Sequence, residues 1–122
     1  MKLGGSNSTF VVVQWTADPD TSRAWPIAGL HLHRDEDEAW YVLDGRLGFL
    51  IGDEEIEAGA GEGVFVPRGT PHSYWNAAPS QTRYVLVMGP QTAALVDELH
   101  QPDITDYAAA FERHGSELVR PE

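Results

Sequence analysis

The sequence predicts a mainly β protein, a jelly-roll barrel followed by one or two C-terminal α-helices. Short runs rich in β-branched and aromatic residues recur up to about residue 90, and Gly, Pro and Asp separate them. Short strands at such spacing are typical of a sandwich or barrel, and a jelly roll protects their edges. After Pro90 the apolar spacing becomes helical. A chain of 122 residues is expected to be one domain, with the barrel in 1–90 and a helical extension packed on it in 91–122.

Turn residues bound each predicted strand. The strands are predicted at residues 9–16, 27–33, 38–44, 46–51, 54–58, 63–67, 72–76 and 83–89. Gly52 and Asp53 form a typical two-residue hairpin turn between the strands at 46–51 and 54–58.

The turn between the strands at 63–67 and 72–76 has a local cause at each step. Pro67 fixes φ, Gly69 permits a positive φ, and Pro71 keeps Thr70 extended. This turn delivers His72 at the start of a strand.

Two helices are predicted after the barrel. The first spans 92–100, and the second, which Asp103 or Thr105 could cap, ends at Gly115. One face of the second helix carries Tyr107, Ala110, Phe111 and His114. This face either packs on the outside of the barrel or covers the mouth of its pocket.

His31 and His33 are candidate metal ligands, because residues i and i+2 of a strand point to the same face. Residues 34–37 then form a connection of a length common in hairpins, which would place Glu38 opposite His33 and Trp40 opposite His31. The alternative is an exposed acidic turn with two exposed histidines. Against it, Glu38 opens an apolar strand, where a carboxylate needs a partner such as a metal ion.

Two motifs in this chain resemble those of the cupins. His31, His33, Glu38 and Gly45 match the first motif, and the second is filled by Gly61, Pro67, Gly69, His72 and Asn76. One departure is Trp25, which stands where the first motif usually opens with Gly. The resemblance is strongest to small single-domain cupins similar to bacterial quercetin dioxygenases. It implies a double-stranded β-helix fold and a metal ion held by His31, His33, Glu38 and His72.

Aromatic residues near these ligands are candidates for the walls of a substrate pocket. Trp40 shares a strand face with Glu38, and Tyr74 shares one with His72. Phe49 and Phe65 are further candidates on weaker grounds, because barrel strands can fill either face.

The amino-acid composition limits which metals and macromolecules the protein is expected to bind. The chain has no cysteine, so any metal must be held by nitrogen and oxygen. A net charge of −11 argues against a nucleic-acid partner, which requires clustered Lys and Arg. No long apolar run or secretion signal is evident, so we expect a cytoplasmic protein without membrane contact.

Three imidazoles and one carboxylate suit one divalent Fe, Mn, Ni, Cu or Zn ion and would leave two octahedral positions open. The first hypothesis is a dioxygenase-type enzyme acting on a small aromatic or enol-containing molecule, with Glu38 also acting as a catalytic base. The alternatives are a non-redox isomerase, cyclase or lyase from a sugar or polyketide pathway, and a small-molecule-binding cupin without turnover. The family resemblance, together with the apolar strand at 10–13, further predicts a homodimer.

Overall fold

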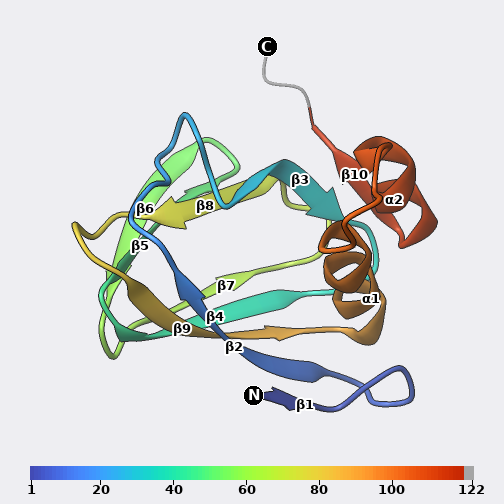
Figure 1. Ribbon diagram of the computed structural model, residues 1–122, viewed down its shortest axis with the longest axis horizontal. Helices are drawn as coiled ribbons and strands as arrows, with labels where there is room; N and C mark the ends of the chain where they lie inside the picture. The colour runs from blue at the N-terminus through green and yellow to red at the C-terminus, as the bar shows by residue number, and fades with distance from the viewer. Residues whose placement is uncertain (120–122) are drawn as a thin grey trace.

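The computed structural model describes residues 1–119, which form two antiparallel five-stranded sheets that face each other as a barrel (Figure 1). The strand orders are β1-β2-β9-β4-β7 and β10-β3-β8-β5-β6. The strands are β1 (Lys2–Leu3), β2 (Val11–Ala17), β3 (Ala28–His33), β4 (Glu38–Asp44), β5 (Arg46–Ile51), β6 (Glu54–Gly59), β7 (Gly63–Val66), β8 (His72–Asn76), β9 (Thr82–Met88) and β10 (Ser116–Leu118). The mainly β fold class is confirmed, and the predicted turn at Gly52 joins β5 to β6 as a hairpin.

The chain changes sheet at most of its connections. Strands β2, β4, β7 and β9 lie in one sheet, whereas β3, β5, β6 and β8 lie in the other. Inward-facing side chains from both sheets therefore meet in one interior, and its most buried large residues include Val11, Val42, Leu47 and Phe49. The alternation of buried and exposed residues along β4 and β9 is that of strands with one face toward this interior.

Two short strands were not predicted. β1 pairs with β2, and β10 pairs with β3. Segments of two and three residues are too short to show a hydrophobic periodicity. They form strands because each pairs with the edge strand of a sheet.

Pairing with β1 also corrects one premise of the sequence analysis. Residues 11–13 lie between β1 and β9, so they are not the free edge that was expected to need a second subunit. The homodimer stays a prediction without that support.

Helices α1 (Pro90–Leu99) and α2 (Tyr107–Arg113) lie together at the end of the barrel where β3 ends (Figure 1). Asp106 caps α2 by accepting a hydrogen bond from the backbone N–H of Ala109, so the prediction of Asp103 or Thr105 as the cap was wrong. Each helix contributes apolar side chains to a small second core of Leu95, Ala110 and Phe111.

The segment after α2 returns to the barrel as β10, so the C-terminal extension is not wholly helical. The last three residues of the predicted extension, 120–122, lie outside the described residues. Within residues 1–119, neither helix is long and apolar enough to cross a membrane.

Candidate metal centre

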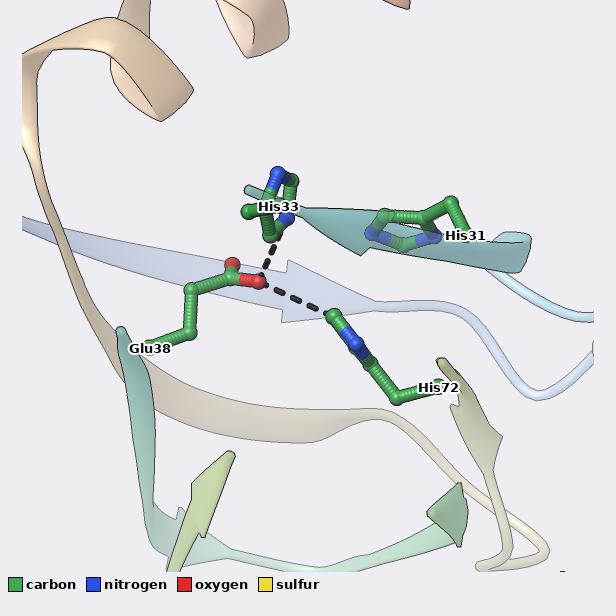
Figure 2. Close-up of side chains that lie close together, drawn as sticks. All are labelled: His31, His33, Glu38 and His72. Carbon is green, nitrogen blue, oxygen red and sulfur yellow. Dashed lines mark hydrogen bonds and ion pairs between the residues drawn. The ribbon is translucent and has the colours of Figure 1, made fainter. Parts of the chain in front are cut away.

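The structure brings the four predicted ligands together inside the barrel (Figure 2). His31, His33, Glu38 and His72 are each at most 6% exposed. One potential ligand atom from each lies within 4.8 Å of the corresponding atoms of the other three. Four convergent polar side chains in an apolar interior need a common partner, because burial without one is costly.

The three histidines come from neighbouring strands of one sheet. His31 and His33 share a face of β3, as their spacing predicts, and His31 is paired directly with His72 of β8. The turn from Pro67 to Pro71 delivers His72 at the first residue of β8, also as predicted. Gly69 has the positive φ of +81° that this turn requires.

Glu38 arrives from the opposite sheet, which corrects the predicted hairpin. β3 and β4 are not paired: Glu38 lies opposite Val66 of β7 and Met88 of β9. Trp40 likewise lies opposite Val64 and Leu86 rather than His31. Residues 34–37 therefore cross the barrel, and Glu38 meets His33 across the interior.

Tertiary partners hold the crossing loop. The Glu36 carboxylate accepts hydrogen bonds from the backbone N–H groups of Gln91 and Thr92, at 3.1 and 2.6 Å, in the first turn of α1. Asp37 accepts one from the backbone N–H of Arg68 at 2.8 Å, and the Arg68 side chain lowers the pKa of Asp37. These partners come from residues distant in sequence, so a local pattern could not distinguish a crossing from a hairpin.

Each histidine has its Nδ1 atom within hydrogen-bond distance of an oxygen outside the cluster. Nδ1 lies 2.5 Å from the Gly29 carbonyl in His31 and 2.9 Å from the Thr70 carbonyl in His72. Because a carbonyl can only accept, these two Nδ1 atoms carry the hydrogen, and the neutral ring of His31 has its lone pair on Nε2. A lone pair on Nε2, with Nδ1–H held by an acceptor, is the usual state of a metal-binding histidine.

The spacing of the ligand atoms fits a shared ion. Glu38 Oε1 lies 2.8 Å from His33 Nε2 and 3.0 Å from His72 Nε2. Adjacent ligands of an octahedral ion at about 2.1 Å would be roughly 3 Å apart. Although His33 Nε2 is buried, it makes no hydrogen bond of good geometry with any described residue. A metal ion would satisfy that atom.

The electrostatics of the cluster also favour a cation. Burial, with repulsion from His72 and His33, lowers the pKa of His31 to about 3, so this imidazole is neutral. Burial by itself would raise the pKa of Glu38, but the imidazoles of His33 and His72 outweigh it and lower that pKa to about 2. The site thus presents an ionised carboxylate and, at His31, a neutral nitrogen donor, and this pairing suits a divalent transition metal.

A cavity of about 690 Å³ is lined by Phe111, which contacts His31, but by none of the four candidate ligands. Its walls come from the barrel and from both helices, and they include Trp15, Tyr74, Tyr84 and Phe111. The Phe111 ring packs edge-on against His31, with ring centroids 5.4 Å apart. Phe111 of α2 therefore contacts both the cavity and a candidate ligand, and the covering of the pocket mouth by this helix stays a prediction.

The predicted pocket residues have different positions. Tyr74 lines the cavity, whereas Trp40 and Phe49 are packed in the barrel core, where Trp40 contacts both His72 and Tyr74. Phe65 was a wrong prediction, because it is 61% exposed. Its neighbour Val66 is buried opposite Glu38, and alternation along β7 therefore turns Phe65 outward.

Sequence reasoning missed two residues near the centre. Ser116 lies 2.6 Å from His33 Nδ1, and Tyr84 lines the cavity beside Tyr74. Ser116 belongs to a three-residue strand with no recognisable motif. Tyr84 shares the buried face of β9 with Leu86 and Met88, so strand parity could have identified it as an inward-facing residue.

Residues 22–88 match the family described as Cupin domain, which is more than half of the chain. The chain belongs to the cupin family. α1, α2 and β10 follow the matched region, whereas all four candidate ligands lie within it.

Individual relatives of this cupin differ in activity. It is 42% identical to quercetin 2,3-dioxygenase from Bacillus subtilis over 45 residues. This match covers 37% of this chain and 13% of that protein. A sugar phosphate isomerase from Silicibacter pomeroyi is 21% identical with a TM-score of 0.58, and the match covers 67% of this chain and 51% of that one. The polyketide cyclase RemF from Streptomyces resistomycificus is 28% identical with a TM-score of 0.56, over 68% and 56% of the two chains. This cupin thus spans about half the length of these structural relatives and a small part of the dioxygenase.

Proposed function

We propose that this cupin is a metal-dependent enzyme of dioxygenase type that acts on a small aromatic or enol-containing molecule. The observation that carries the proposal is a buried centre of three imidazoles and one carboxylate beside a cavity with aromatic walls. His31, His33, Glu38 and His72 would hold one Fe, Mn, Ni, Cu or Zn ion. Such an ion supplies a Lewis acid and, when redox-active, a place where O2 and an electron-rich substrate can meet.

Two tyrosines are suited to orient a substrate oxygen. The hydroxyls of Tyr74 and Tyr84 lie 2.9 Å apart at the cavity wall. Burial raises the pKa of Tyr74 and raises that of Tyr84 to about 12, so both phenols stay protonated at neutral pH. One hydroxyl donates to the other, so the second keeps a proton that it can donate to a substrate carbonyl or enolate oxygen.

The low pKa of Glu38 favours a ligand role over a base role. A pKa of about 2 makes its carboxylate a weak proton acceptor at neutral pH, since catalytic bases work best near the operating pH. A base role would require Glu38 to separate from His33 and His72, which lower that pKa. The catalytic role of Glu38 therefore stays a prediction.

The charge of the cavity favours neutral substrates. Among the described residues that line it, Asp18 and Asp20 are acidic and none is a Lys or Arg. A phosphorylated sugar would find no Lys or Arg side chain among these lining residues, where His100 is the one basic group. A neutral aromatic molecule instead matches walls such as Trp15 and Tyr74.

A second candidate is a non-redox cyclase that uses the same ion as a Lewis acid. The likeness to polyketide cyclase RemF over 68% of this chain supports it, and polyketides share the aromatic and enol chemistry of the first candidate. A protein that binds such molecules without turning them over is the third possibility.

Oxygen uptake separates these candidates. Protein loaded with each metal in turn would be mixed with flavonols and with β-diketones, and His72→Ala would serve as the control. We expect uptake with at least one redox-active metal and none with the variant. Turnover that proceeds equally without oxygen would favour the cyclase, and binding without any product would overturn both enzyme proposals.

A further inference from the structure

The three histidines of the candidate centre are held in two different ways. His31 and His72 each donate from Nδ1 to the carbonyl two residues earlier, that of Gly29 and of Thr70. His33 has no such local contact, and its Nδ1 partner is the hydroxyl of Ser116, 83 residues along the chain. One of the three imidazoles is thus oriented by a remote segment.

Ser116 is built into this position. It is fully buried, and β10 pairs with β3 so that Ser116 lies directly opposite His33. Because paired residues share a face of the sheet, its hydroxyl points into the barrel at the imidazole. The distance from Ser116 Oγ to His33 Nδ1 is 2.6 Å.

Backbone contacts on both sides hold β10 against β3. The N–H of Arg34 donates to the Gly115 carbonyl, and that of Val119 donates to the Leu30 carbonyl, both at 2.9 Å. Gly115, with φ of +72°, allows the chain to turn from α2 directly into β10. The position of Ser116 is therefore set by the sheet and does not depend on its side chain alone.

We propose that Ser116 is a positioning residue of the metal centre. Its hydroxyl accepts the Nδ1 hydrogen of His33 and so presents the Nε2 lone pair of that ring to the ion. Ser116 lies outside the residues that match the cupin family, so the C-terminal segment of this chain would complete a site whose ligands all come from the family region. The inference rests on the metal centre of the proposed function and not on its reaction.

Loss of such an outer hydrogen bond typically weakens metal affinity by about 10- to 100-fold. Ser116→Ala should therefore bind Zn²⁺ about 10- to 100-fold more weakly than the wild type in competition with a chromogenic chelator. Ser116→Thr, which keeps the hydroxyl, should recover most of this affinity. Ser73→Ala is the matched control, because it removes another buried hydroxyl from the face of β8 opposite to His72.

Histidine NMR gives a readout that a purely structural role would not change. In the Zn²⁺-loaded wild type, long-range ¹H–¹⁵N spectra should show His33 protonated at Nδ1, with slow exchange of that proton. Exchange should accelerate in Ser116→Ala but not in Ser73→Ala. The wild-type spectrum tests the proposal even if Ser116→Ala does not fold.

The outcomes are distinguishable. Weakened Zn²⁺ affinity in Ser116→Ala alone, with rescue by Thr, supports the inference. Unchanged affinity in Ser116→Ala, an equal loss in Ser73→Ala, or coordination of Zn²⁺ through His33 Nδ1 would overturn it while leaving the metal centre intact. Absence of Zn²⁺ binding by the wild type would overturn the metal centre and this inference together.

Discussion

His72 and Glu38 reach the same centre through connections of opposite character. The turn before His72 is specified by its own residues, since Pro67, Gly69 and Pro71 each restrict or permit a particular backbone geometry. Remote contacts add to this local cause, because the backbone N–H groups of Arg68 and Gly69 donate to Asp37 and to the His33 carbonyl. The loop before Glu38 is held by remote groups. Glu36 accepts hydrogen bonds from the first turn of α1, and Asp37 accepts one from the backbone of Arg68. A locally determined turn can be inferred from its residues, whereas a crossing loop depends on what the rest of the fold places beside it.

Removal of a candidate ligand should have the largest effect on metal binding, because it changes the centre to which both connections deliver a side chain. His72→Ala removes one of the nitrogen donors and leaves Glu38 with one fewer imidazole partner. We expect loss of most bound metal, measured by elemental analysis after gel filtration. His100→Ala is the control, because that ring stacks on Trp15 outside the cluster. Full metal occupancy in His72→Ala would show that the site lies elsewhere.

Disruption of the crossing loop should have the next largest effect. Glu36→Ala leaves two backbone N–H groups of α1 without their carboxylate, and hydrogen bonds to charged groups each contribute about 1.5–3 kcal/mol. We expect the free energy of unfolding to fall by about 3 kcal/mol in urea denaturation, the lower end for two such bonds, together with weaker metal binding. Asp35→Ala, an exposed position in the same loop, should change neither. Equal effects of the two substitutions would argue against remote anchoring.

Backbone strain in the turn before His72 should lower the free energy of unfolding by less than the loss of the Glu36 contacts. Gly69→Ala forces a side chain into a φ of +81°, although no atom lies within 4 Å of the added Cβ. The expected loss is about 1 kcal/mol from backbone strain alone. Thermal unfolding would measure it, and metal affinity should stay close to that of the wild type if the turn re-forms with His72 in place. Gly52→Ala, at another open glycine with positive φ, shows the strain cost away from the centre.

Removal of the exposed ion pair between Asp37 and Arg68 should have the smallest effect on stability. Asp37→Asn keeps an oxygen for the Arg68 backbone but removes the charge. The pKa of Asp37 is lowered in the folded protein, so its stabilising contribution is present above the unfolded value of 3.8 and is lost as pH falls through the lower folded pKa. The difference in melting temperature between wild type and variant should therefore shrink in acid and in high salt. A difference that is insensitive to both would show that the charge does not act there.

The sequence predicted the parts of this cupin that depend on nearby residues. Strand parity placed His31 and His33 on one face, the Pro and Gly turn placed His72 at a strand entrance, and periodicity located both helices. The sequence left open which face of its strand Phe65 occupies, and the structure shows that its side chain is exposed. The cap of α2 was misplaced because several capping residues, Asp103, Thr105 and Asp106, lie close together before the helix.

The sequence alone identified the four candidate ligands, because strand parity places His31 and His33 on one face and the full set, with Glu38 and His72, matches the two motifs that resemble those of the cupins. Only the tertiary structure decided that Glu38 faces His33 across the barrel and that Ser116 lies against His33. Both contacts join segments whose relative position depends on which sheet each strand enters. That choice is made by burial of the common interior and by remote hydrogen bonds, neither of which appears in a short stretch of sequence.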